Sequence, residues 1–219
     1  MSLQPSPGAM ATFRAMAEPV TIAILAKAPI AGAVKSRLIP ALGADGAALL
    51  AARMLDHAVD IACAAAVGPV VLWATPDPTH GHFQSLQQRH AIALARQPNG
   101  DLGARMHAAI VAVGAPVLVI GADCPALNAE HLRAAALALR EHDVVVIPAE
   151  DGGYVLIGLR KPAPMLFTGV TWSTSSVMAE TRQCLQALGL TWHEFEALWD
   201  VDRPEDMDRL RRAGLLGGR

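Results

Sequence analysis

The stretch VTIAILAKAPIAGAVKSRLIP, residues 20–40, begins as a β-branched and apolar run and continues as a loop that carries three cations. Both faces of an extended chain over residues 20–26 are almost entirely apolar, which is typical of a strand that is covered on both sides of a sheet. The cations Lys27, Lys35 and Arg37 follow in a segment whose glycine and prolines favour turns. The sequence therefore predicts a central strand that leads directly into a cationic loop.

This cationic loop is not a P-loop. That phosphate-binding motif reads GxxxxGK[ST], and here Val34 occupies the position of the glycine that precedes the lysine. The whole chain has 18 Lys and Arg residues against 20 Asp and Glu residues, so no basic field recruits nucleic acid. The three cations of the loop therefore need a local anionic partner, and nucleic acid is not expected to be one.

Further apolar runs alternate with helical segments along the chain. The additional strands are expected at residues 69–75, 91–97, 116–123, 143–149 and 153–159. Ala- and Leu-rich helices are expected at 44–66, 102–113 and 128–141, and two more at 174–188 and 204–213. Strands that are apolar on both faces need helices on both sides, so we expect a three-layer α/β/α sandwich around a mostly parallel sheet. The length suits a single domain, which we place at residues 19–215.

The start of the chain and its cysteines indicate the cellular setting. Residues 1–18 show no hydrophobic period and are expected to be a disordered N-terminal extension. They lack the pattern of a signal peptide, and no run of 18 apolar residues follows. The three cysteines are far apart in sequence, which predicts free thiols and no disulfide framework or thiolate zinc site. We expect a cytoplasmic protein without a membrane partner.

Acidic residues follow several of the predicted strands, at the edge where sheets of this kind bind ligands. Asp123 in GADCP ends an apolar run, and it is either an Asx-turn residue or a ligand for Mg²⁺ or Mn²⁺. Asp200 and Asp202 in DVD would face the same side of an extended chain. Alternatively, Asp202 complements the dipole of the helix that follows it, an explanation that does not cover Asp200.

Two glycine-containing segments also allow two interpretations each. Gly152 and Gly153 in EDGGY permit a ligand to approach the backbone closely, but a tight β-turn would need the same residues. In NGDLGARM, Asp101 is either a helix N-cap or part of a site, and Arg105 is either a solvated helix residue or a ligand contact. The local sequence does not decide between these alternatives.

Taken together, these blocks carry a family resemblance. In order along the chain they are KAPIAGAVKSRL (27–38), GDLGARM (100–106), GADCPAL (121–127), EDGGYVLIGL (150–159), Trp172 and DVDRPEDM (200–207). With them the chain resembles the bacterial glycosyltransferase-A-fold family of nucleotide-diphospho-sugar transferases, some of which are described as arsenosugar-biosynthesis-type glycosyltransferases. It is more loosely similar to 2-phospho-L-lactate guanylyltransferase, although it has DGGY where that enzyme's pattern has GGTN.

The resemblance implies a Rossmann-like nucleotide-binding half that is merged with an acceptor-binding half. It implies the following nucleotide contacts: Lys27, Lys35, Arg37, Gly100, Asp101 and Arg105. It implies the following acceptor contacts: Gly152, Gly153, Tyr154 and Trp172. It also implies that Asp123, with Asp202 or Asp200, binds Mg²⁺ or Mn²⁺ and so takes part in catalysis. Asp151 is a second catalytic candidate, as a general base.

The function expected from this resemblance is metal-dependent transfer from a nucleotide-activated donor. The main expectation is glycosyl transfer from a nucleotide-diphospho-sugar to a small-molecule acceptor. One alternative is nucleotidyl transfer from a nucleoside triphosphate to a phosphorylated small acid, with release of pyrophosphate. Another alternative is a nucleotide-binding module without catalysis. A serine hydrolase is disfavoured because no GxSxG motif follows a strand.

Overall fold

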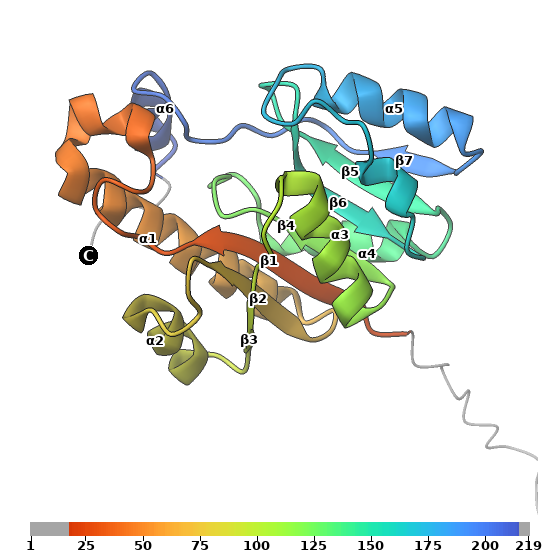
Figure 1. Cartoon of the computed structure of the whole chain (residues 1–219), viewed down its shortest axis with the longest axis horizontal. Helices are drawn as coiled ribbons and strands as arrows, with labels where there is room; N and C mark the ends of the chain where they lie inside the picture. The colour runs from red at the N-terminus through yellow and green to blue at the C-terminus, as the bar shows by residue number, and fades with distance from the viewer. Residues whose placement is uncertain (1–17, 215–219) are drawn as a thin grey trace, which may run out of the picture.

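The computed structural model of the chain describes residues 18–214, which contain one seven-stranded sheet (Figure 1). The strands are β1 (Thr21–Lys27), β2 (Val70–Thr75), β3 (Ala93–Arg96), β4 (Val117–Ile120), β5 (Val144–Pro148), β6 (Tyr154–Leu159) and β7 (Trp192–Glu194). The helices are η1 (Ser36–Leu38), α1 (Ile39–Ala65), α2 (Gly81–Arg89), α3 (Leu102–Val113), α4 (Ala129–Ala138), η2 (Pro164–Phe167), α5 (Val177–Ala187) and α6 (Asp206–Arg212). The predicted disordered extension, 1–18, lies outside the described residues apart from its last position.

The strand order is β3-β2-β1-β4-β6-β5-β7, and only β6 runs antiparallel to its neighbours β4 and β5. The predicted mostly parallel sheet is therefore confirmed. After β1 the chain adds β2 and β3 on one side of this strand, and it then returns to place β4 on the other side. Such a reversal opens a crevice at the carboxyl ends of the two central strands, where ligands of α/β sheets bind.

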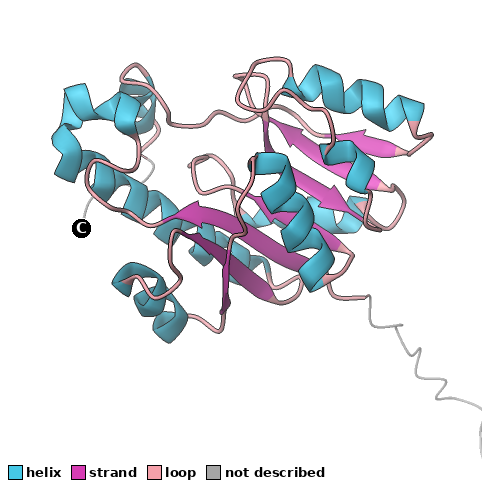
Figure 2. Cartoon of the chain, in the orientation of Figure 1, coloured by secondary structure: helices cyan, strands magenta, loops and turns pink. Residues whose placement is uncertain are grey.

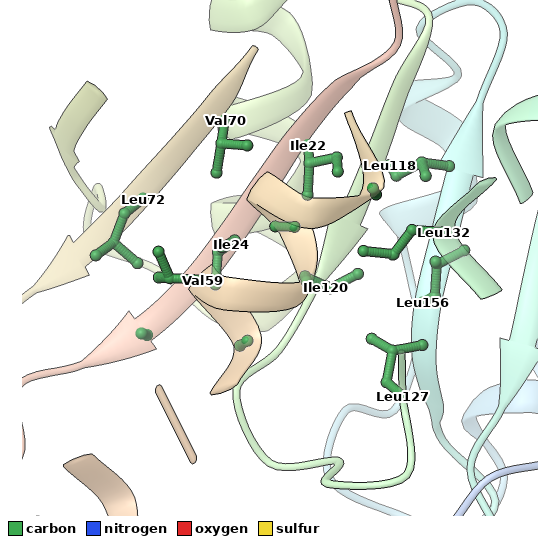
Figure 3. Close-up of a cluster of buried hydrophobic side chains, with 14 of the residues drawn as sticks. Ile22, Ile24, Val59, Val70, Leu72, Leu118, Ile120, Leu127, Leu132 and Leu156 are labelled. Atoms are coloured by element: carbon green, nitrogen blue, oxygen red, sulfur yellow. The ribbon is translucent and has the colours of Figure 1, made fainter. Parts of the chain in front are cut away.

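Both faces of the sheet are covered by helices, as the apolar strands predict (Figure 2). On one face, Ile22 and Ile24 of β1 share a core with Val59 of α1 and Leu132 of α4 (Figure 3). On the other face, Ala23 of the same strand belongs to a second core that includes residues of α3 and α5. Alternate residues of one strand thus enter different cores, which produces the three-layer sandwich.

Helix α1 is long and apolar, and one of its faces is buried in the core. The stretch Ser36–Ala65 is by length and composition long and apolar enough to cross a membrane. In this structure Leu55, Val59 and Ala62 of the same helix are buried in the core next to the sheet. This packing accounts for the apolar residues on the face of α1 that is turned toward the sheet.

The structure differs from the prediction at the start of α1 and in α2 and β7, and it adds the short 3-10 helices η1 and η2. Helix α1 begins at Ile39, five residues before the predicted start, because Pro40 suits a first helical turn and the helix then bends at Gly43 (φ 71°). Helix α2 was not among the predicted helices; it buries only Phe83 and Leu86, too few apolar residues for a clear period. Strand β7 was also missed, because three residues are too few to show alternation.

Candidate active site

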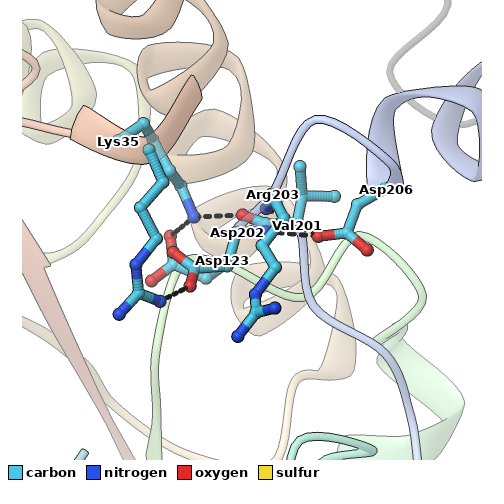
Figure 4. A network of polar contacts seen from close by, with 7 residues as sticks. Lys35, Asp123, Val201, Asp202, Arg203 and Asp206 are labelled. Atoms are coloured by element: carbon cyan, nitrogen blue, oxygen red, sulfur yellow. Dashed lines mark hydrogen bonds and ion pairs between the residues drawn. The ribbon is translucent and has the colours of Figure 1, made fainter. Parts of the chain in front are cut away.

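Segments that are far apart in sequence meet at the carboxyl edge of the sheet, beside the β1–β4 reversal. The loop after β1 contributes Lys35, and the loop after β4 contributes Asp123. The segment before α6 is fixed there because the Val201 amide donates a hydrogen bond of 2.9 Å to the Asp123 carbonyl. The Val201 carbonyl in turn accepts a hydrogen bond from the Lys35 ammonium (Figure 4). One lysine therefore connects three segments of the chain.

Lys35 is the most constrained of the three cations in the first loop. Its Nζ is 2.7 Å from Asp123 Oδ1, and its side chain is only 7% exposed, whereas that of Asp123 is 61% exposed. The backbone of Lys35 has the left-handed conformation (φ 48°, ψ 42°), which is unfavourable for a residue with a Cβ. Strained backbone of this kind is typical of functional sites, where the surrounding structure holds it in place.

Asp200 lies close to Asp123 and Asp151, and its own burial and the negative charges of both carboxylates raise its pKa. Burial, and then the charge of Asp151, raise the pKa of the Asp200 carboxyl to about 6, while Lys35 acts in the opposite direction. The charge of Asp123 also raises the pKa of Asp200, by less than burial or the charge of Asp151 does. We call these three carboxylates, Asp123, Asp151 and Asp200, the acidic group. They come from three different loops, and Lys35 is next to them.

Two members of the acidic group, Asp123 and Asp200, are suitable ligands for a magnesium or manganese ion. Mg²⁺ binds through one or two carboxylates and completes its shell with phosphate oxygens and water, so Asp123 and Asp200 offer suitable oxygen ligands. No three His, Cys, Asp or Glu residues form a ready metal cage within residues 18–214. Asp202, the other predicted ligand, is instead ion-paired with Arg37. The charge of Asp123 acts on the pKa of Asp200, so Asp200 is better placed than Asp202 to share a metal ion with Asp123.

The carboxylate of Asp206 organises the segment before α6. Its Oδ2 accepts hydrogen bonds from the amides of Asp202 (2.9 Å) and Arg203 (2.7 Å). The helix that follows is attached to the β5–β6 turn, because Arg209 donates two hydrogen bonds, of 2.6 and 2.8 Å, to the Glu150 carboxylate. The same guanidinium is 4.6 Å from the ring centroid of Trp199. The acidic residues of DVDRPEDM thus differ in role. Asp206 holds the backbone of the segment before α6 in place, and this structural role explains its presence.

Two of the other predicted nucleotide contacts, Lys27 and Arg105, line a pocket of about 280 Å³ at the ends of β1 and β2, whereas Gly100 and Asp101 do not line it. Its lining consists of Lys27, Ala28, Ile30, Ala33, Val34, Thr75, Pro76 and Arg105. Arg105 is oriented by a hydrogen bond of 3.0 Å from its Nε to the Gly100 carbonyl. Asp101 accepts a hydrogen bond of 2.8 Å from the Ala104 amide, so the structure shows it as the N-cap of α3. The pocket thus combines two cations with apolar walls.

The turn between β5 and β6 is packed against the protein itself. Gly152 has φ 94°, and a Cβ at this position would be 2.2 Å from the Ser175 carbonyl oxygen. Its own carbonyl accepts a hydrogen bond of 2.8 Å from the Met178 amide, and the Gly153 amide donates one of 2.9 Å to Asp151 Oδ1. The close approach that Gly152 permits is therefore an approach of the backbone around Ser175.

Trp172 and Tyr154 form an aromatic wall next to this turn. Their ring centroids are 6.4 Å apart in an edge-to-face arrangement, and Phe167 stacks on the indole at 6.5 Å. A Cβ at Gly103 would be 2.6 Å from the indole ring, so the glycine allows Trp172 to lie directly on α3. The sequence prediction missed the roles of Phe167 and Gly103, although the second glycine of GDLGARM was a usable signal.

Comparison with known proteins adds to this geometry. Residues 58–174 match the family described as "Uncharacterized protein conserved in bacteria (DUF2064)". The chain belongs to this family. It is 32% identical to 3-phospho-D-glycerate guanylyltransferase of Phenylobacterium zucineum (strain HLK1), over 81% of this chain and 84% of the relative. It is 24% identical to 2-phospho-L-lactate guanylyltransferase of Methanosarcina barkeri, over 80% of each chain.

Among solved structures, this DUF2064 protein is similar to a crystal structure from Desulfovibrio desulfuricans G20 that is provisionally named a nucleotide-diphospho-sugar transferase. The two share 28% sequence identity and a TM-score of 0.81, over 89% of this chain and 87% of the other. The predicted resemblance, the fold and the enzyme class are thereby confirmed, so the protein is a nucleotide-dependent transferase.

The raised pKa of Asp200 gives a prediction for stability. An acid whose folded-state pKa exceeds its ordinary value of 3.8 contributes stability at low pH, and this contribution is lost as the pH rises through about 6. A shift of this size corresponds to about 3 kcal/mol, which solvent screening at a half-exposed carboxylate reduces to about 1 kcal/mol. Asp200→Asn should therefore raise the free energy of unfolding at pH 7 by about 1 kcal/mol, as measured by urea denaturation.

The control for this prediction is the pH dependence. The stability difference between Asp200→Asn and the parent should shrink as the pH falls from 7 to 4, because the parent carboxyl is then protonated as well. An asparagine variant that is less stable than the parent at pH 7 would contradict the burial and the repulsion by Asp151 that raise the pKa of the Asp200 carboxyl.

Proposed function

We propose that this protein is a nucleotidyltransferase that joins the nucleoside monophosphate unit of GTP to the phosphate of a small phosphorylated carboxylic acid and releases pyrophosphate. The observation that carries the proposal is the match to two guanylyltransferases over four fifths of the chain. The names of these relatives differ in the acid but agree in the guanylyl group and in a three-carbon phosphorylated acid as acceptor. This proposal replaces glycosyl transfer as the preferred reaction.

The proposed reaction forms one phosphorus–oxygen bond and breaks another. An oxygen of the acceptor phosphate attacks the α-phosphorus of the triphosphate, and the bond from this phosphorus to the oxygen that leads to the β-phosphate breaks. The product contains a new diphosphate linkage, and pyrophosphate departs. Little covalent chemistry is left for the protein, so catalysis rests on positioning and on neutralisation of phosphate charge.

The cations of the site are suited to this neutralisation. Lys27 and Arg105 share the 280 Å³ pocket, while Lys35 is paired with Asp123 of the acidic group and Arg37 with Asp202. A hydrogen bond from a charged donor contributes about 1.5–3 kcal/mol, so several such contacts would hold a triphosphate and a phosphorylated acid with useful affinity. The acceptor adds a carboxylate, which is a second group that needs a cationic partner.

Asp123 and Asp200 would hold Mg²⁺ or Mn²⁺ in this proposal. A bound divalent cation would neutralise charge on the donor phosphates and on the departing pyrophosphate. Asp151 is then not needed as a general base, because a phosphate with a second pKa near 6 is already an anionic nucleophile at neutral pH. We assign Asp151 instead to the β5–β6 turn, where it accepts the Gly153 hydrogen bond.

Glycosyl transfer is the second candidate. It is favoured by the similarity to the Desulfovibrio desulfuricans protein and by the aromatic wall of Tyr154 and Trp172, since sugars pack against aromatic rings. In that reaction the acceptor is a neutral hydroxyl, and Asp151 would be required to remove its proton. The sequence DGGY in the β5–β6 turn also differs from the GGTN pattern of the guanylyltransferase.

A ligand screen by thermal unfolding separates the two candidates. A ligand that binds only the folded protein raises its apparent stability by mass action. We expect GTP to raise the melting temperature, and Mn²⁺ to increase this effect. Stabilisation by a guanosine diphosphate sugar but not by GTP would favour glycosyl transfer over our proposal.

A matched pair of variants shows whether the pocket holds the nucleotide. Arg105→Met should reduce the GTP-induced shift, because Arg105 lines the pocket. Arg140→Met makes the same change of charge at an exposed position after α4 and should leave the shift unchanged. If GTP raised the melting temperature of both variants by the same amount, the nucleotide would not bind in this pocket.

A further inference from the structure

The ammonium of Lys35 occupies one oxygen of the carboxylate that we propose as a metal ligand. Its Nζ is 2.7 Å from Asp123 Oδ1, and it also donates a hydrogen bond to the Val201 carbonyl (Figure 4). A divalent cation that takes Oδ1 of Asp123 as a ligand would have to displace this ammonium, and one on Oδ2 would lie close to it. Two cations on one carboxylate repel each other, so the ammonium and a metal at Asp123 should weaken each other's binding.

Lys35 is the direct counter-ion of the acidic group in the part of the chain that the structure describes. Asp123 forms an ion pair with Lys35, and among residues 18–214 neither Asp151 nor Asp200 forms any ion pair. Three neighbouring carboxylates thus share one buried ammonium. The group carries an excess of negative charge, which attracts a further cation.

The donors of Lys35 are only partly used. An ammonium has three N–H donors, and those of Lys35 have two partners, the Asp123 carboxylate and the Val201 carbonyl. Within residues 18–214 the third donor has no partner, so it could bind an anion once the ammonium is released. The left-handed backbone of Lys35 holds the side chain in this place at a conformational cost, so its position is set by the loop and not by chance.

We propose that Lys35 is an internal counter-ion that competes with the divalent cation for Asp123. In the free protein it neutralises this carboxylate and holds the segment around Val201 against the loop after β4. When a metal and a nucleotide bind together, the metal takes Asp123, and the released ammonium turns to the phosphates of the nucleotide. The exchange keeps both Asp123 and Lys35 paired with an opposite charge at each stage. It rests on the proposed function for the identity of the anion.

The direct test is binding of Mn²⁺ alone, followed by the EPR signal of the free ion. Lys35→Met keeps the length of the side chain and removes its charge. We expect this variant to bind Mn²⁺ about tenfold or more tightly than the parent in the absence of nucleotide, because the competing charge is gone. In the presence of Mn²⁺ it should bind GTP more weakly than the parent.

Lys161→Met is the matched control, because it removes the same charge at an exposed position after β6. Lys161 forms no ion pair among the described residues, so its loss should leave Mn²⁺ affinity within about twofold of the parent. An equal gain in both variants would mean that only general electrostatics is at work and would overturn the proposal. Unchanged or weaker Mn²⁺ binding by Lys35→Met would also overturn it.

A second measurement uses the unaltered protein, in case Lys35→Met does not fold. The chain contains three lysines, Lys27, Lys35 and Lys161, so acylation of each can be followed by peptide mass spectrometry. We expect saturating Mn²⁺ to raise the acylation rate of Lys35, and added GTP to lower it again. Lys161 serves as the reference for general reactivity. A Lys35 rate that does not change with Mn²⁺ would refute the exchange.

These tests separate the exchange from the proposed function. Neither the Mn²⁺ titration nor the labelling needs turnover. If the protein releases pyrophosphate but Lys35→Met shows no gain in Mn²⁺ affinity, only the exchange is wrong. If the affinity gain is found and no transfer occurs with GTP, the proposed reaction is wrong and the competition for Asp123 holds.

Discussion

Replacing Asp123 by asparagine should lower kcat/KM for nucleotidyl transfer about a thousandfold or more, which corresponds to about 4 kcal/mol of transition-state stabilisation. The reason is that Asp123 is the carboxylate at the β1–β4 reversal that both Lys35 and our proposed metal contact. Asparagine keeps an oxygen that can accept the Lys35 hydrogen bond, so the protein should remain folded. Initial rates of pyrophosphate release measure the effect.

The matched control for this prediction is Asp208→Asn. Asp208 is an exposed carboxylate of α6 that pairs with Arg211 three residues later, so the same change of charge there should leave the rate within about twofold. Circular dichroism and a thermal melt verify the fold of both variants. A rate for Asp123→Asn within tenfold of the parent would remove Asp123 from the catalytic site.

The second large effect is expected in stability. Gly152→Ala should reduce the free energy of unfolding by about 3 kcal/mol or more, because the new Cβ would overlap the Ser175 carbonyl and the backbone has positive φ. The distance from this Cβ to the carbonyl oxygen would be 2.2 Å, which requires the β5–β6 turn or the segment around Ser175 to move. Urea denaturation of the purified variant measures the loss.

Gly189→Ala separates backbone strain from steric overlap. Gly189 also has positive φ, 64°, but a Cβ there would have no atom within 4 Å. It should therefore show only the left-handed penalty of about 1–2 kcal/mol. Equal losses in the two variants would mean that the contact between Gly152 and Ser175 is not tight, and that the turn leaves room for a ligand after all.

The comparison of sequence and structure shows which parts of the fold are encoded locally. Helix α3 has the predicted bounds, Leu102–Val113, because Asp101 caps its start and Gly114 ends it. Strand β1 was recognisable because each of its faces enters a core. Strand β7 depends on pairing with β5, a contact between distant segments that three residues cannot encode alone.

The sequence allowed most residues of the site to be predicted one by one, but it did not reveal which of them form ion pairs with one another. The position of Asp123 follows from an apolar strand that ends in a turn. Its partner Lys35 could not be read from the sequence, because 88 positions separate them and only the strand order brings them together. Likewise, the alternation of DVD does not reveal that Arg37 engages Asp202, while Asp200 lies near Asp123. These pairings depend on how the loops pack at the sheet edge.

The central claim is the formation of a diphosphate linkage from a triphosphate and a phosphorylated acid. Phosphorus NMR of the protein with GTP, Mg²⁺ and either 3-phospho-D-glycerate or 2-phospho-L-lactate tests it directly. We predict the signals of a new diphosphate and an equal amount of pyrophosphate with at least one of these acids, and no product with Asp123→Asn. Intact GTP with both acids, together with sugar transfer from a guanosine diphosphate sugar, would contradict the account.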